Sequence, residues 1–343
     1  MHWFSPPSIF PTRAKRAKLR SFLPRSPKAV SAVLLSVVPI FVLILLGWIL
    51  AKARILKAGA DAVLGELVFK IALPVLIFRT FAHANLGEAS AVKLWAAYFI
   101  GVIVTWTAGT FIARRFFKRD AKVGVIAGLS GAFANNVFIG LPLVDSFVGP
   151  DGLVALSLLI AVHLPLMMMA GLILMERAAA KVDGTASQGV VAVGRLVVRN
   201  LVRSPLVIAV VVGLLFNLLG LSLPRIASAV IDPIAQVAGP LALLSIGMTL
   251  EKYSLRGELG LAAMSTSFKL LLLPAVVLAA SWALALPRDW AMALVLNASI
   301  PTGVNAWLVA ERFKAGQSLA ASTITLTTLL GVVTVSLWAW GLQ

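Results

Sequence analysis

The chain has 343 residues, of which 60% are hydrophobic and 13% charged, and its mean hydropathy is +0.98. This composition excludes a soluble globular protein, and continuous apolar runs of about twenty residues favour membrane-spanning helices over a β-barrel. The net charge of +17 does not indicate a nucleic-acid partner, because most cations stand beside apolar runs, and the absence of cysteine excludes disulfides and thiolate metal sites.

Residues 1–29 form a basic arm that contains several prolines. The arm has neither the apolar core nor the small-residue cleavage site of a signal peptide. We expect a disordered segment that lies on anionic lipid, and a start codon assigned too far upstream would explain the arm equally well.

Ten apolar runs follow, five on each side of a polar loop at 176–203. The spans are predicted at 33–51, 62–82, 92–113, 123–148, 153–175, 205–221, 226–250, 259–286, 290–312 and 318–340. The chain therefore divides into a first five-helix unit at 30–175, a cytoplasmic linker at 176–203 and a second five-helix unit at 204–343.

Lysine and arginine gather in the loops after the odd-numbered spans. The positive-inside rule places these loops in the cytoplasm and both termini outside. Because each unit has an odd number of spans, the second unit must be inverted relative to the first. The predicted fold class is an all-α integral membrane protein with ten transmembrane helices in two inverted five-helix repeats.

Spans four and nine carry the sequence marks of broken helices. The segment AFANNVFIGLPLVD at 132–145 and the segment LVLNASIPTGVNAWLVA at 294–310 each combine two asparagines with glycine and proline. Proline removes a backbone donor, and lipid cannot satisfy exposed backbone groups, so both breaks must face protein or water. Two broken helices at matching places in two halves indicate a transporter site where they cross.

Crossed breaks would bring several half-helix ends to one point. A helix N-terminus carries about half a positive charge and free N–H groups, so such a site suits a carboxylate or similar anion. The alternative is that the amides only cap the broken backbone. The candidate substrate-binding residues are Asn135, Asn136, Gly140, Pro142, Asn297, Pro301, Thr302 and Asn305.

Glu66 and Lys70 stand four residues apart on one face of span two. We interpret the pair as an element that couples transport to a proton or sodium ion, and a structural salt bridge explains it equally well. No bound cofactor or metal is expected. The similar segments Phe69-Lys70…Pro74 and Phe268-Lys269…Pro274 are attributed to chance, because their spacing would pair span two with span eight.

A rival interpretation starts from Gly128-Leu129-Ser130-Gly131, which resembles the nucleophile motif of rhomboid intramembrane proteases. His163 would be the base, but it lacks the following glycines of that family, and a helix-packing role is the commoner one for such a residue. Lys269 would snorkel or pair with an unidentified group. We therefore expect no catalytic residue and no enzyme.

Several stretches together resemble the auxin efflux carrier family, which includes bacterial malonate and malate permease-like proteins. They are NNVFIGLPL at 135–143, SPLVIAVVVGLLFNLLGLSLP at 204–224, PLALLSIGMTL at 240–250, FKLLLLP at 268–274 and NASIPTGVNAWLVAERF at 297–313. The resemblance implies a fold like that of the bile acid symporters, with crossing broken helices 4 and 9. It also implies a scaffold made by the first two helices of each repeat and a mobile unit that moves like an elevator.

In the family the substrate-contacting asparagines correspond to Asn136 and Asn305, and a charged pair resembles Glu66 and Lys70. Val137 departs from the family, where a smaller residue is commoner. We expect a secondary transporter of a small organic anion (malonate, malate or an auxin-like acid) in the bacterial cytoplasmic membrane. A bile-acid-symporter-like carrier of another solute and a homodimer through the scaffold helices remain open.

Overall fold

The structure is a computed structural model that describes residues 27–84, 90–183, 199, 202–253, 255 and 259–342, with side chains from residue 35 onward. The predicted basic arm and most of the predicted linker lie outside the described residues. Within these ranges the regular structure is helical apart from one isolated β-bridge. Six helices are long and apolar enough to cross a membrane, as the composition predicted.

The helices are α2 (Pro27–Lys52), α3 (Ala60–Leu67), η1 (Val68–Ala72), α4 (Leu73–Ala82), α5 (Ala91–Arg115), α6 (Ala121–Ala132), η2 (Asn136–Gly140), α7 (Leu141–Phe147), α8 (Pro150–Asp183), α10 (Pro205–Leu218), α11 (Arg225–Leu250), α12 (Leu259–Ser267), η3 (Phe268–Leu272), α13 (Leu273–Ala283), α14 (Arg288–Ser299), α15 (Asn305–Arg312) and α16 (Gln317–Gly341). The helix that contains the predicted fifth span continues beyond Met175 to Asp183 through a run of alanines, the best helix formers.

Three turns widen into π-helix, and each is followed by a Leu-Pro pair. The π-turns η1, η2 and η3 end directly before Leu73-Pro74, Leu141-Pro142 and Leu273-Pro274. Because proline has no N–H and its ring crowds the preceding turn, a wider turn lets the helix continue through it. The likeness of the segments 69–74 and 268–274, attributed to chance from the sequence, therefore has a shared local cause.

The same turn corrects the predicted position of the first break. Pro142 stands in the first turn of α7, and η2 leads into α7 without interruption. The helix is instead interrupted earlier, at Phe133–Asn135, between the end of α6 and the start of η2. In span nine the break lies at 300–304 and does contain Pro301, as predicted.

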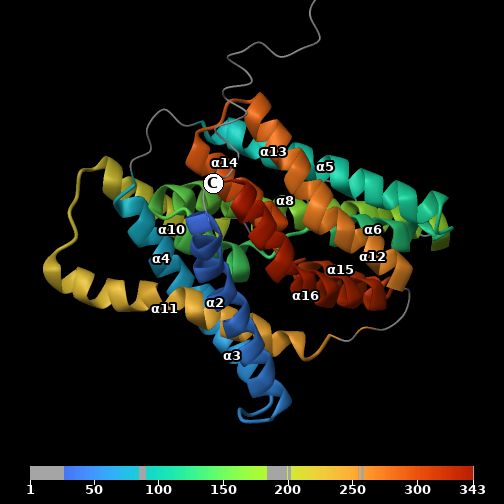
Figure 1. Cartoon of the computed structure of the whole chain (residues 1–343), viewed down its shortest axis with the longest axis horizontal. Coiled ribbons are helices and arrows are strands. Elements are labelled where there is room, and N and C mark those ends of the chain that lie inside the picture. The colour runs from blue at the N-terminus through green and yellow to red at the C-terminus, as the bar shows by residue number, and fades with distance from the viewer. Residues whose placement is uncertain are drawn as a thin grey trace, which may run out of the picture.

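The helices form two packed groups (Figure 1). In one group α2 packs on α11 and α4 packs on α10 and α11, and in the other α5 packs on α6 and α13 while α8 contacts α6 and α14. At the crossing of α2 and α11 the backbones touch, because a Cβ on Gly47 would lie 2.2 Å from the carbonyl oxygen of Leu244. Such close contact of small residues is how helices pack in lipid.

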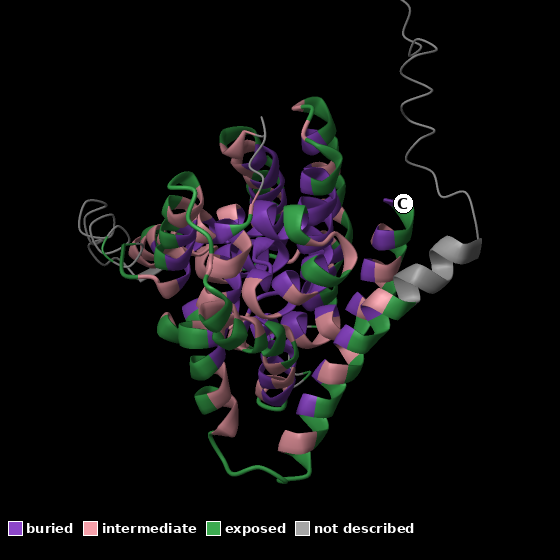
Figure 2. Cartoon of the chain, turned by 90° about the vertical axis from the view of Figure 1, so that its left-hand side faces the viewer, coloured by how far each residue is buried: buried purple, intermediate pink, exposed green. Residues whose placement is uncertain are grey.

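Buried residues gather in the middle of the molecule and exposed residues at its periphery (Figure 2). Every residue from Trp290 to Ser299 on α14 is buried, and so is every residue from Gly124 to Ala132 on α6. In contrast, α2 and α10 carry exposed leucine, isoleucine and valine side chains, as expected for helices that face lipid. The first halves of the two broken helices, α6 and α14, are thus the most deeply buried elements of the described chain.

Candidate substrate site

The two helix interruptions meet and satisfy each other's backbone. Ala134 and Thr302 form an antiparallel bridge, in which Asn135 N donates to Pro301 O at 3.1 Å and Gly303 N donates to Phe133 O at 2.9 Å. Backbone groups that the breaks expose are therefore paired across the crossing, which is what a buried break in a membrane helix requires. The crossing joins positions that lie more than 160 residues apart in the sequence.

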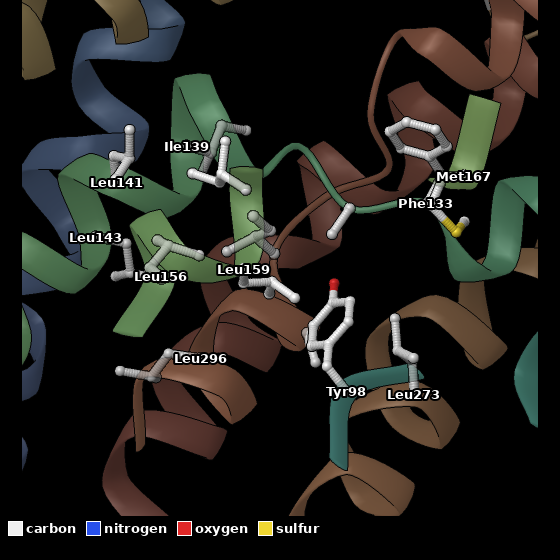
Figure 3. Packing of buried hydrophobic residues seen from close by; sticks show 14 of the residues in the cluster. Tyr98, Phe133, Ile139, Leu141, Leu143, Leu156, Leu159, Met167, Leu273 and Leu296 are labelled. Atoms are coloured by element: carbon white, nitrogen blue, oxygen red, sulfur yellow. The ribbon is translucent and has the colours of Figure 1, made fainter. Parts of the chain in front are cut away.

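A buried amide pair lies next to this crossing. Asn297 Nδ2 on α14 donates to Asn136 Oδ1 at 3.0 Å and to the hydroxyl of Tyr98 at 3.3 Å. Figure 3 shows Tyr98 pointing its hydroxyl away from its own helix α5 and into the packed cluster. Asn136 Nδ2 and Asn297 Oδ1 have no partner among the described groups, so each amide keeps one unused hydrogen-bonding atom.

Gly140 makes this amide pair possible. A Cβ at this position would lie 2.4 Å from Asn297 Oδ1, well inside van der Waals contact. Only glycine therefore lets η2 approach α14 closely enough for Asn136 and Asn297 to bond. The glycine predicted as a substrate-binding residue acts through Asn297 in this structure.

A cavity of about 250 Å³ adjoins the crossing. Its amides come from the starts of the two second half-helices, with Asn135 and Asn136 at η2 and Asn305 as the first residue of α15. The remaining wall is apolar and aromatic, and His163 completes it: Phe69, Phe133, Ala134, Val137, Phe138, Ile160, Leu164 and Val304. Two helix N-termini, each with a partial positive charge, thus border one small cavity.

The amides do not all play the same part. Asn135 Oδ1 accepts from Phe138 N at 3.4 Å and so caps η2, which is the backbone role that the sequence left open. Asn305 lines the cavity and makes no side-chain hydrogen bond within the described part of the chain. Asn136 both lines the cavity and bonds Asn297.

The other ends at the crossing are the C-termini of the first half-helices. In the last turn of α6, Ser130 O accepts from Thr302 Oγ1 at 2.8 Å, and further from the end Ala127 O accepts from Ser265 Oγ at 3.0 Å. On α14, Ala298 O accepts from the ammonium of Lys269, a residue of η3 with no exposed surface. One C-terminal end is therefore bound by a hydroxyl group and the other by the side-chain nitrogen of a lysine.

Several predicted site residues lie outside the cavity wall. Thr302 and Pro301 hold the crossing together, and Pro142 lies in α7. Glu66 and Lys70 form an ion pair on the exposed face of the second span, with 61% of each side chain accessible. Phe69, beside Lys70, is the residue of that stretch that lines the cavity.

The residues of the protease alternative are also placed. Ser130 Oγ and His163 Nε2 are both buried without a hydrogen-bond partner in the described part of the chain, so the two side chains do not bond each other. His163 packs against Phe133 and Tyr98, with ring centroids 5.2 and 5.4 Å apart. This is the packing role expected from the sequence, and a nucleophile–base contact is absent from these two residues.

Comparison with known proteins identifies the family. The family model described as "Membrane transport protein" matches residues 32–339. The chain belongs to this family, the auxin efflux carrier family. It is 28% identical to a Methanothermobacter thermautotrophicus protein named "Uncharacterized transporter", over 89% of this chain and 96% of that one.

Two bacterial relatives match this chain over a similar part of its length. A Rhizobium meliloti protein named "Putative malonate transporter" is 28% identical over 88% of this chain and 92% of its own length. The Escherichia coli protein named "Uncharacterized transporter YfdV" is 24% identical over 88% of this chain and 95% of its own. This carrier-family chain is thus a multi-pass membrane transport protein, as the motifs at both broken helices indicated.

Proposed function

We propose that this transporter is a secondary carrier of small mono- or dicarboxylates in the bacterial cytoplasmic membrane. The observation that carries the proposal is the cavity at the crossing, which two helix N-termini and the amides of Asn135, Asn136 and Asn305 border. Free N–H groups and positive dipole ends favour a carboxylate over a neutral or cationic solute. No chemical conversion of the substrate is part of the proposal.

The size and lining of the cavity narrow the substrate class. Its volume of about 250 Å³ lies below the roughly 300–1,000 Å³ of pockets that hold drug-sized ligands. The described lining contains no arginine, so the site lacks a bidentate carboxylate clamp and favours weak, releasable binding. The name of the Rhizobium meliloti relative makes malonate the first substrate to test.

For the architecture we propose ten spans in two inverted five-helix repeats. The helix contacts support this. If span one corresponds to span six, span two to span seven and so on, a contact between two helices should be matched by a contact between their counterparts. The contact of α2 with α11 is matched by that of α10 with α4, and the contact of α8 with α14 by that of α16 with α6. An odd number of spans per unit makes the exchanged units opposite in orientation.

The two packed groups support an elevator mechanism. The group α2, α3, α4, α10 and α11 would be the scaffold and dimer surface, and the group with both broken helices would carry the cavity across the membrane. Coupling to a proton or sodium ion is proposed to involve Glu66 and Lys70, which flank the cavity residue Phe69. The pair would act from the scaffold side.

A thermal-shift screen tests the substrate class. The purified protein is heated with malonate, malate, short monocarboxylates and matched amides at several pH values, and the best ligand is then used for flux into liposomes. Stabilisation by carboxylates but not by their amides, followed by saturable uptake, is expected. Stabilisation by neutral or cationic solutes alone would refute an anion carrier, and labelling of Ser130 by a serine-directed probe would favour the protease.

Cross-linking tests the elevator. The sequence contains no cysteine, so introduced pairs react alone. Positions Phe41 on α2 and Gly331 on α16 lie in contact between the two groups, whereas Phe78 and Phe216 contact each other within the scaffold group. A short bifunctional thiol reagent should stop uptake in the Phe41→Cys/Gly331→Cys protein and spare it in the Phe78→Cys/Phe216→Cys protein. Uptake that survives the first cross-link would exclude relative sliding of the groups.

A further inference from the structure

Lys269 is a basic residue in the most buried part of the described chain. It lies on η3, next to the crossing, and none of its surface is accessible. Burying a charge is costly unless the charge is paired and hydrogen-bonded. Among the described residues, no carboxylate lies within ion-pair distance of Lys269.

The partner of Lys269 is a helix end. Its ammonium donates to Ala298 O in the last turn of α14, where the unpaired carbonyls carry about half a negative charge. In carriers built from broken helices, such C-terminal ends coordinate the coupling cation. In this protein the side chain of Lys269 occupies that end in place of a bound ion.

The position links Lys269 to the anion cavity through adjacent groups. Ala298 follows Asn297, and Asn297 donates to Asn136, which lines the cavity. Asn136 Nδ2 and Asn297 Oδ1 are unpaired. At the corresponding end of α6, the side-chain donor that the described residues supply is the Thr302 hydroxyl, so the lysine is found at one of the two ends.

No alternative cation site competes in the described part of the chain. There, no group of three or more histidine, aspartate or glutamate side chains could hold a metal ion. The crossing itself offers amides and hydroxyls but no carboxylate. A mobile metal ion at the α14 end would have to displace the Lys269 ammonium.

We propose that Lys269 is the resident cation of the substrate site: its ammonium takes the place of a metal ion at the α14 C-terminus and attracts the carboxylate into the cavity. The inference rests on the proposed anion transport. It assigns Lys269 as a positioning residue that acts through Asn297 and Asn136. It makes carboxylate binding independent of sodium, so that of the two coupling ions proposed for Glu66 and Lys70 only the proton is compatible with it.

The experiment measures stabilisation of the purified full chain by malonate, in buffers whose only added cation is either sodium or choline. Wild type should give the same malonate affinity in both, and sodium alone should not stabilise it. Lys269→Met should weaken malonate binding by about tenfold or more, because the buried amine at the α14 end of the crossing is gone. Lys57→Met, which removes an exposed loop lysine, is the matched control and should bind as wild type.

Two further variants separate charge from packing. Methionine fills the lysine space without a buried charge, so if Lys269 served only in packing, Lys269→Met should be more stable and bind malonate better than Lys269→Arg. We expect the opposite order for malonate affinity, with Lys269→Arg retaining more of it than Lys269→Met. Lys269→Ala opens the α14 end and should gain a stabilisation by sodium, measured without any carboxylate.

Sodium-dependent malonate binding in wild type, or wild-type affinity in Lys269→Met, would overturn the inference. If wild type responds to no carboxylate, the proposed function fails, while the sodium titration of Lys269→Ala against wild type still decides the role of Lys269. Equal stabilisation of wild type and Lys269→Ala by sodium would then contradict the proposal that the Lys269 side chain takes the place of a metal ion.

Discussion

The two interrupted helices use the same geometry with different chemistry. At the first, the Thr302 hydroxyl binds the C-terminal end of α6 and Asn135 caps the following η2. At the second, the Lys269 ammonium binds the C-terminal end of α14, and Asn305 at the start of α15 makes no side-chain cap. The first break is thus closed by neutral groups, and the second keeps a charge and an open N-terminus. Under the proposed anion transport, we expect the second break to contribute the charge that attracts the anion and the capped first break to contribute rigidity as well as the amide of Asn136.

Asn136→Ala should have the largest effect on transport. It removes a cavity amide and one partner of Asn297, so malonate binding should weaken by about tenfold to a hundredfold, the loss expected for a hydrogen bond to a charged group. The measurement is ligand-dependent stabilisation together with uptake into liposomes. Asn217→Ala is the control, because Asn217 bonds Ala82 O and Ala84 O outside the cavity. Equal loss in both variants would mean that Asn136 matters only for folding.

Gly140→Ala should destabilise the crossing. The added methyl would meet Asn297 Oδ1 at 2.4 Å, so α14 or Asn297 must shift, at a cost of about 1–3 kcal/mol for overpacking. A lower melting temperature and weaker malonate binding should appear together. Gly171→Ala, where no atom lies closer than 3.7 Å to the new Cβ, should change neither property. A Gly140→Ala protein with wild-type binding would show that the amide pair is not needed.

Asn305→Ala and Asn135→Ala test the difference between the two N-terminal ends. Losing the uncapped Asn305 should weaken malonate binding by about tenfold with little effect on stability, because its amide is free for the ligand. Losing Asn135 should instead lower stability by about 1 kcal/mol, since it removes a cap. Thermal melts with and without malonate separate the two. Weaker malonate binding in Asn135→Ala together with lower stability in Asn305→Ala would contradict the roles assigned to the two asparagines.

Lys70→Ala should have the smallest effect on stability, because the Glu66–Lys70 pair is exposed and within one helix. Its expected effect is on coupling: uptake should lose its dependence on a proton or sodium gradient while carboxylate binding persists. Flux measured with and without each gradient decides this. If uptake by Lys70→Ala depends on the ion gradient as wild type does, the Glu66–Lys70 pair has no role in coupling and is only a surface salt bridge.

Much of this arrangement could be predicted from local sequence. Apolar runs located the helices, and the pairing of asparagines with proline and glycine located the two stretches that contain the breaks, because proline and glycine disturb helices. The exact break in span four was missed, since a π-turn lets the helix pass Pro142 and moves the interruption to Phe133–Asn135. Periodicity alone does not reveal such turns.

Other features depend on contacts between distant segments. Tyr98 was overlooked although it is one of two tyrosines in the chain and stands in an apolar span, a signal that could have drawn attention to its hydroxyl. Lys269 was noted as an isolated cation, but its partner is a backbone carbonyl in another helix, and no sequence pattern encodes that choice.

Hydrogen exchange with and without the best carboxylate tests the central claim most directly. If both helix N-termini bind the anion, backbone amides at 135–141 and at 304–308 should gain protection together when ligand is added, and neither should in Asn136→Ala. Protection at only one of these stretches, or at a site remote from both, would contradict a shared site at the crossing.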